Sequence, residues 1–148
     1  MKLPYQYKTT LFLLVALCMT AMATGCGGDD PSLEELTLND LSATWQVNNV
    51  ENDDLDVSDQ FNGFMLTVNR DGTFSTTNGS NPWPAQGTYE FSDETIRHIR
   101  RDDGVNITIQ TLTPTRLTLS FSMTDVRGEA NNTDGITGAF IFDLTKTN

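Results

Sequence analysis

Residues 105–123 read VNITIQTLTPTRLTLSFSM, and this stretch decides the fold class that the sequence predicts. Apolar and polar side chains alternate along 105–110 and again along 117–123. A period of two residues is typical of an antiparallel strand with one face in a core and the other in water. The segment TPT at 113–115 separates the two halves and is a tight-turn signal, so the stretch predicts a β-hairpin.

The same alternation continues on both sides of this hairpin, from about residue 43 to the end of the chain. Threonine and β-branched residues are abundant there, which suits strands. We expect eight strands, at residues 44–50, 63–69, 73–77, 87–92, 95–101, 104–112, 115–123 and 136–145.

The connections between these strands fall into two length classes. In simple up-and-down order, odd-numbered connections lie at one end of the sheet and even-numbered ones at the other. All three long connections, 51–62, 78–86 and 124–135, fall at the same end, which we call the mouth; the opposite end is the base. The short connections are the turns at 69–72, 92–94, 101–104 and 113–115.

This distribution predicts an all-β fold, namely an eight-stranded antiparallel up-and-down barrel with a long-looped mouth and a short-looped base. Both ends of the barrel segment then lie at the base. A short N-terminal helix is expected over 31–41, where Ser32 and Glu35 fit a capping box, and it could cap the base. The rival fold is an immunoglobulin-like β-sandwich, which predicts two sheets and no pairing of the first strand with the last.

Charge and cysteine usage exclude several functions. The chain has 148 residues, which argues for one domain, and a formal net charge of −11. From Cys26 onward there are 7 basic and 20 acidic residues, a formal charge of −13. That sign argues against nucleic acid and against docking on an anionic membrane through charge. Cys18 and Cys26 are the two cysteines, so a disulfide framework or a cysteine zinc site is not expected.

The first segment has the features of a secretory signal peptide. Lys2 and Lys8 precede an apolar run at 11–23, and small residues follow it. A helix of 13 residues spans roughly 20 Å, less than the ~30 Å hydrocarbon core of a bilayer.

The end of that segment, Ala23-Thr24-Gly25-Cys26, resembles a bacterial lipobox. The resemblance implies cleavage before Cys26, a diacylglyceryl thioether on its sulfur and acylation of the new amine. Several acyl chains are needed because a single chain gives only marginal membrane binding. The alternative is an ordinary signal peptidase site that leaves a free thiol.

Residues 27–30, Gly-Gly-Asp-Asp, resemble the export signal that sends Bacteroidota lipoproteins to the cell surface; the alternative is a solvated spacer. The expected organisation is a signal peptide at 1–25, a tether and short helix at 26–42 and the barrel at 43–148. The expected location is the cell envelope, as an outer-membrane lipoprotein, with surface exposure open.

Four motifs resemble the lipocalin-like domains of Bacteroidota lipoproteins: Thr44-Trp45 in the first strand, NRDGTF at 69–74, GTYEF at 87–91 and ITIQTLTPTRLTLSF at 107–121. The resemblance covers roughly residues 41–145. It implies an eight-stranded barrel, often with an apolar interior able to take a small molecule. Classical lipocalins pack an arginine from the end of the last strand across the tryptophan, whereas Lys146 is the nearest cation here.

The expected inward side chains are bulky. An eight-stranded barrel is just wide enough to be filled by side chains or to hold one small ligand, so a filled core and a ligand cavity both stay open. The expected inward set is Trp45, Val47, Phe64, Leu66, Val68, Phe74, Tyr89, Phe91, Val105, Ile107, Ile109, Leu117, Leu119, Phe121, Met123, Phe140 and Phe142.

Candidate ligand contacts lie mainly at the mouth. Trp83 lies between two prolines in the 78–86 connection. It could cover the barrel mouth or stack on a ligand, or it could pack onto the rim in a purely structural role. Arg100 and Arg101 could bind a carboxylate or phosphate, or they could balance the adjacent acids. The remaining candidate ligand contacts are Phe64, Tyr89 and Met123.

Other chemistry has little support. The acids of 53–59 could hold calcium, but their spacing is not that of an EF-hand, and a solvated loop explains them. His98 is the single histidine, and no nucleophile triad or phosphate-binding loop is apparent. We therefore expect no catalysis, no metal and no cofactor. The expected function is binding of a small apolar or amphipathic ligand at the mouth; the alternative is a filled barrel that acts as a structural or protein-interaction module.

Overall fold

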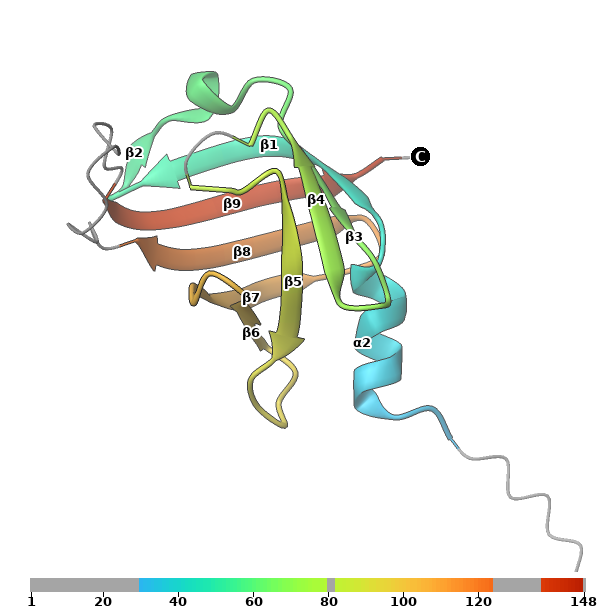
Figure 1. Ribbon diagram of the computed structural model, residues 1–148. Helices are drawn as coiled ribbons and strands as arrows, with labels where there is room; N and C mark the ends of the chain where they lie inside the picture. The colour runs from blue at the N-terminus through green and yellow to red at the C-terminus, as the bar shows by residue number, and fades with distance from the viewer. Residues whose placement is uncertain (1–29, 80–81, 124–136, 148) are drawn as a thin grey trace, which may run out of the picture. The chain divides into compact units, whose positions relative to one another are not determined.

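A single antiparallel sheet closes on itself in the computed structural model, which describes residues 30–79, 82–123 and 137–147 (Figure 1). The strands follow chain order around the sheet, and the first long strand pairs with the last. The elements are α2 (Leu33–Leu41), β1 (Thr44–Asn52), β2 (Leu55–Asp56), the 3₁₀ turn η1 (Ser58–Phe61), β3 (Met65–Val68), β4 (Thr73–Thr77), β5 (Gln86–Phe91), β6 (His98–Arg101), β7 (Asn106–Leu112), β8 (Arg116–Met123) and β9 (Gly138–Lys146).

Closure comes from the pairing of β1 with β9. The register runs from Trp45 opposite Lys146 to Asn52 opposite Phe140. The closed eight-stranded antiparallel barrel with one short helix is thereby confirmed, and the sandwich alternative is wrong because it leaves these two strands unpaired. The short β2 is an addition to the barrel, paired only with the end of β1.

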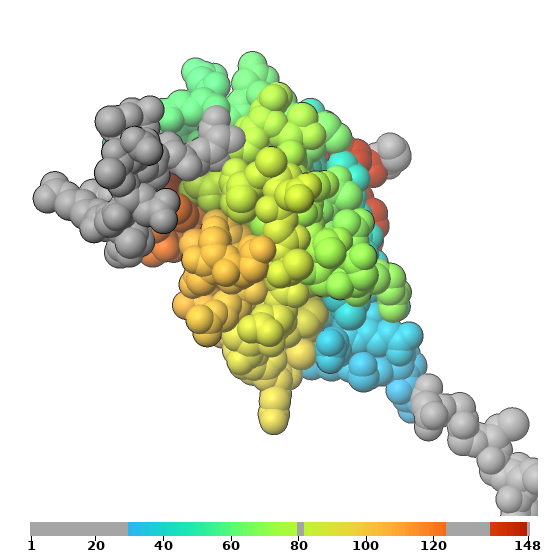
Figure 2. All heavy atoms as spheres, viewed as in Figure 1, coloured from blue at the N-terminus to red at the C-terminus, as the bar shows by residue number. Residues whose placement is uncertain are grey.

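The base of the barrel is the end where β1 begins and β9 ends. The Thr147 amide donates to the Thr44 carbonyl there, at 2.9 Å. Helix α2 lies against this end, beside the β5–β6 turn (Figure 2). The β4–β5 connection, which carries Trp83, lies at the opposite end because the strands alternate in direction.

The ends of helix α2 are set by residues that the sequence identifies. Ser32 is the N-cap, and its hydroxyl accepts the Glu35 amide at 3.1 Å. At the other end Leu41 is buried, and its carbonyl accepts the Trp45 indole N–H at 2.9 Å. This hydrogen bond fixes the end of the helix to the barrel. The Lys146 ammonium lies 5.9 Å from the centre of the Trp45 ring, a cation–π distance.

Two segments differ from the sequence expectation. The connection 51–62 contains β2 and η1, because Asp53 and Asp54 adopt positive φ and make a tight turn. Strand β6 begins at His98 rather than residue 95, because Ile96 has a φ of 56° and cannot continue a strand. The turn expected at 92–94 therefore extends to residue 97.

The core consists of the inward faces of all eight strands, together with Leu41 of α2 and three side chains from mouth connections, Phe61, Phe64 and Trp83. Every member of the expected inward set lies in this core or packs against it. The alternation thus predicts these inward positions, but the expected set omits Val50, Leu144 and Arg101, which are also buried; for Val50 the reason is the register shift between Val47 and Asn49.

Candidate functional site

Trp83 fills the barrel from the mouth. Its side chain is 5% exposed, so the indole occupies the interior rather than the rim. It packs on aromatic rings of four strands or connections, with centroid distances of 5.9 Å to Phe64, 6.0 Å to Phe74, 5.5 Å to Phe121 and 5.8 Å to Phe142. The space left beside it is about 30 Å³, room for about one or two water molecules.

Arg101 also points into the barrel. The side chain is 2% exposed. Among the described residues, it is the one charged side chain that is classed as buried. It shares the inward face with Tyr89, its pairing partner on β5. The Nη1 atom donates to the Pro82 carbonyl at 3.1 Å, and Nε donates to Asp103 Oδ1 at 3.1 Å, while Nη2 pairs with the second oxygen of Asp103.

The Trp83 ring completes the surroundings of this charge. The guanidinium carbon lies 4.9 Å from the indole centroid and 5.9 Å from that of Phe121, which are cation–π distances. Burial acts to raise the pKa of the Asp103 carboxyl, but hydrogen bonds from Arg101 and the Val105 amide leave it below its ordinary value of 3.8. Asp103 is therefore a carboxylate at neutral pH and balances the arginine.

The Trp83 indole nitrogen has no hydrogen-bond partner within the described residues, although it is buried. Buried indole N–H groups usually find a partner, and an unpaired one costs free energy. The interior thus combines Arg101, which is paired with Asp103, with the indole N–H of Trp83, which has no partner within the described residues.

The expected ligand contacts do not form one site at the mouth. Trp83, Arg101 and Phe64 are brought together inside the barrel, and the same small void borders Trp83, Arg101 and Tyr89. Arg101 lies at the mouth end of β6, as expected, and its side chain turns into the interior, where it pairs with the adjacent Asp103. Arg100 is exposed and lies on the opposite face of β6 from Arg101.

Tyr89 and Met123 are half-buried at the margins of the core. The Tyr89 hydroxyl donates to the Asn69 carbonyl in the β3–β4 turn at the base, at 2.7 Å. Cys26 and the 124–135 connection lie outside the described residues.

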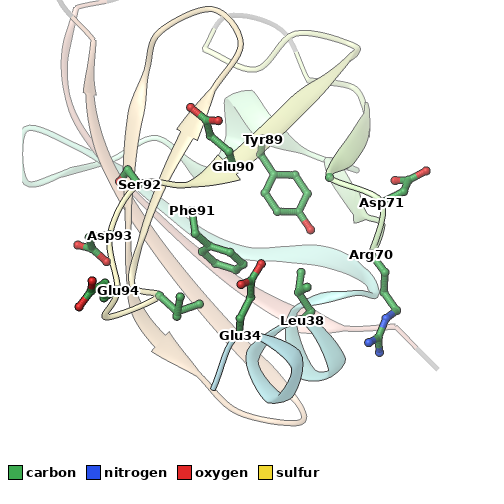
Figure 3. Close-up of a pocket in the computed structure, with 12 residues that line it drawn as sticks. Glu34, Leu38, Arg70, Asp71, Tyr89, Glu90, Phe91, Ser92, Asp93 and Glu94 are labelled. Atoms are coloured by element: carbon green, nitrogen blue, oxygen red, sulfur yellow. The ribbon is translucent and has the colours of Figure 1, made fainter. Parts of the chain in front are cut away.

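A groove of about 640 Å³ lies at the base, between α2, β5 and the β3–β4 and β5–β6 turns (Figure 3). Its floor carries the rings of Tyr89 and Phe91, packed edge to face with centroids 6.2 Å apart. Figure 3 shows Glu34 and Leu38 of α2 projecting toward these rings. This groove was not expected from the sequence.

The rim of this base groove is acidic. Five carboxylates and one guanidinium line it, a formal charge of −4; they belong to Glu34, Asp71, Glu90, Asp93, Glu94 and Arg70. Hydrogen bonds from Thr73 lower the pKa of the Asp71 carboxyl, and hydrogen bonds from Thr95 and His98 lower that of Asp93. Burial, with the charge of Asp71, raises the pKa of Tyr89 to about 12, so its phenol stays neutral.

A second groove, of about 370 Å³, lies on the other flank of α2. It is bordered by Leu33 and Leu36, which are 58% and 49% exposed, and by Leu112. Ile96 borders both grooves, in the left-handed conformation that is strained for a β-branched residue.

No group of three or more potential metal ligands occurs among the described residues. Within the same residues, no helix has the length and apolar character needed to cross a membrane. His98 pairs with Asp93 on an exposed turn. Comparisons with protein-family models, with curated proteins and with solved structures found no match.

Proposed function

We propose that this protein is a lipid-anchored binding module of the cell envelope, in which a filled barrel serves as a scaffold for contacts made from its outside. The observation that carries the proposal is the interior itself. Pockets for small ligands have volumes of roughly 300–1,000 Å³. The void beside Trp83 is about 30 Å³. A side-chain-filled barrel favours an interaction module over a preformed ligand cavity, and binding over catalysis.

The anchor in this proposal is the acylated Cys26, cleaved from its signal peptide and held in the outer membrane. Its support is the lipobox-like sequence at 23–26 and the apolar run before it. Six residues separate Cys26 from Leu33, where α2 begins. The anchor would therefore hold the base of the barrel close to the bilayer.

The binding surface in this proposal is the base groove beside α2, and its partner is a protein segment that carries lysine or arginine. The support is charge complementarity, because the rim has a formal charge of −4. The Tyr89 and Phe91 rings on the floor suit the same groups, since a cation over an aromatic face gains about 0.5–1 kcal/mol at an exposed site. Trp83 has no part in this surface because it is buried.

A peptide that alternates lysine and leucine is a suitable probe, titrated by calorimetry against the full-length mature protein in zwitterionic nanodiscs. Replacing Glu34 and Glu90 together by glutamine removes two rim charges, and we expect about two- to tenfold weaker binding. The control replaces the exposed mouth acids Asp54 and Asp59 by asparagine and changes the net charge equally.

Equal weakening by the two double variants would mean that the peptide responds only to the net charge, which is −13 from Cys26 onward, and the base groove would lose its role. Unchanged affinity in the Glu34/Glu90 variant would have the same consequence. Phe91→Leu keeps the floor apolar but removes a ring, and it should weaken the lysine peptide more than a peptide with leucine alone.

A second candidate is binding of a small amphipathic ligand inside the barrel from the mouth. One observation favours it, namely the pairing of a buried arginine with an unpartnered indole at the mouth end of the core. The interior void bordered by the described residues is about 30 Å³, too small for such a ligand, so a side chain must leave the interior first.

A further inference from the structure

We infer that the barrel interior is a latent site for an amphipathic acid, whose carboxylate binds Arg101 and whose apolar tail replaces the Trp83 side chain. This inference rests on the second candidate function, which it deepens, and it does not depend on the external docking proposed above. It concerns a different surface, a ligand of opposite charge and the opposite end of the barrel.

Trp83 is the replaceable part of the core. Most core residues lie on strands and are held by the sheet, whereas Trp83 lies in the β4–β5 connection between Pro82 and Pro84. No hydrogen bond holds its indole nitrogen within the described residues. Leaving the barrel would let this N–H bind water, which offsets part of the loss of aromatic packing.

Arg101 loses two interactions when this segment moves. Its Nη1 atom binds the Pro82 carbonyl, and its guanidinium lies on the Trp83 ring, so both come from adjacent residues of one connection. Asp103 stays in place, because it binds Nε and Nη2 from the β6–β7 turn. The position that becomes vacant on Arg101 is therefore Nη1, aimed into the barrel.

A carboxylate is the ligand group that this vacancy favours. A hydrogen bond from a guanidinium to a carboxylate is shorter and stronger than one to a neutral carbonyl. A quaternary ammonium head group is disfavoured, because the vacated Nη1 atom is a hydrogen-bond donor and such a head group offers no acceptor. The exposed arginine next to it, Arg100, faces away from the interior and takes no part.

The tail would enter an apolar space. The small void beside Trp83 and Arg101 would merge with the volume that the indole leaves. Its other lining residues are apolar, apart from the Tyr89 hydroxyl that is already bonded to Asn69; the apolar ones are Leu41, Leu66, Val68, Phe74, Ile99, Ile107, Leu117 and Leu119. An unbranched alkyl chain matches this surface by burying its methylenes there.

The test measures binding of decanoate to the full-length mature protein in zwitterionic nanodiscs, with empty discs as background. Decanol and decyltrimethylammonium carry the same tail with a neutral and a cationic head. The readouts are the emission of Trp45 and Trp83, which are the two tryptophans of the chain, and native mass spectrometry of the released protein. We expect decanoate to shift the emission to longer wavelength as Trp83 enters water, with one acid bound per chain.

Trp83→Ala should bind decanoate at least tenfold more tightly than the parent, because the site no longer has to expel the indole. Arg101→Met in that background should weaken decanoate about tenfold or more and leave decanol unchanged. Arg100→Met is the matched control, with the same loss of charge at the neighbouring exposed position, and it should leave both affinities unchanged.

The inference is overturned if Trp83→Ala binds no decanoate, or if it binds decanoate and decanol equally well. The second comparison needs no arginine variant, so it decides the matter even if Arg101→Met does not fold. Loss of lysine-peptide binding in the Glu34/Glu90 variant leaves these results unaffected, because that variant changes only the base groove.

Discussion

Phe142 has the central position among the aromatic side chains of the core. It is fully buried on β9. Its ring lies 5.0 Å from Phe61, 5.4 Å from Phe64, 5.8 Å from Trp83, 5.7 Å from Phe121 and 6.2 Å from Phe140, measured between centroids. One residue thus links the closing strand, the β8 face and both connections that enter the barrel.

Phe142→Ala should lower the free energy of unfolding by about 3–5 kcal/mol, because the cavity it leaves is surrounded by side chains that are already packed. Urea unfolding followed by circular dichroism measures the change. Leu55→Ala is the control, since that side chain is exposed at the mouth, and it should change stability by less than about 0.5 kcal/mol. A loss below about 1 kcal/mol for Phe142→Ala would contradict the packed interior.

Tyr89 allows a test of burial at the base. It is the one tyrosine after Cys26, because Tyr5 and Tyr7 precede that residue. Burial raises the pKa of its phenol from 10.0 to about 12, so the ultraviolet absorbance of the phenolate should appear with a midpoint near pH 12 in the folded mature protein. In denaturant the midpoint should return to about 10.

The same shift sets a direction for stability. The fold favours the neutral phenol, so its contribution is fully present below pH 10.0 and is lost as the pH rises toward about 12. The unfolding free energy of the parent should therefore fall with pH in this interval more steeply than that of Tyr89→Phe. Equal slopes, or a folded-state midpoint near 10, would place Tyr89 in water. A further absorbance step near pH 10 in the folded protein would show that Tyr5 and Tyr7 are retained.

At the scale of elements, the β5–β6 turn contains the clearest conflict between sequence and conformation. Ile96 has a φ of 56°, a region that costs an L-residue roughly 1–2 kcal/mol and is most unusual for a β-branched one. Its side chain borders both grooves beside α2. Such strain is found where function constrains a residue, and here the apolar groove wall is the candidate reason.

Ile96→Gly should raise the unfolding free energy by about 1 kcal/mol, because glycine adopts positive φ without strain, while it weakens binding of the lysine–leucine peptide at the base. A single substitution is therefore expected to increase stability and to decrease peptide affinity. Asp54→Gly, at a φ of 64° in the mouth turn, is the control and should leave peptide binding unchanged. Destabilisation by Ile96→Gly would show that its packing outweighs its strain.

The elements differ in how well the sequence predicts them, for a physical reason. The β7–β8 hairpin is set by local alternation and a short turn, so its bounds and inward faces follow from the sequence. The start of β6 does not, because nothing local in the sequence indicates that Ile96 takes a left-handed conformation. The β2 and η1 segments could not be predicted from the sequence, because a polar connection shows no alternation. The apolar Phe61, which is buried, was the one indication that this connection folds onto the core.

The residues of the interior site also differ in how well the sequence predicts them. The inward position of Arg101 follows from parity with Ile99, two residues before it, although the expected inward set did not include this charged side chain. The burial of Trp83 could not be derived from any local pattern, because it depends on the volume that eight strands leave unfilled. The base groove depends on where α2 lies against β5, which is a long-range contact.

At the scale of the whole molecule, the proposed anchor at Cys26 would determine, together with the fold, which surface of the barrel meets the membrane. The chain from Cys26 to Leu33 advances seven residues, and a fully extended chain spans at most about 3.3–3.6 Å per residue. An acylated Cys26 would therefore keep the start of α2 within roughly 25 Å of the bilayer. The base groove would be close to the lipid, and a basic partner would have to reach it there.

Membrane attachment and orientation are tested together. Cys26→Ser should abolish the acyl mass on the intact protein and move the chain out of the membrane fraction, because no other lipid attachment is proposed. In the acylated protein, a fluorophore at residue 94 in the base turn should be quenched strongly by a quencher on the lipid head groups. A fluorophore at residue 54 in the mouth turn should be quenched weakly, since the strands between base and mouth separate it from the bilayer. Equal quenching at both positions would show that the barrel lies on its side, and the base groove would then be open to partners that stay far from the membrane.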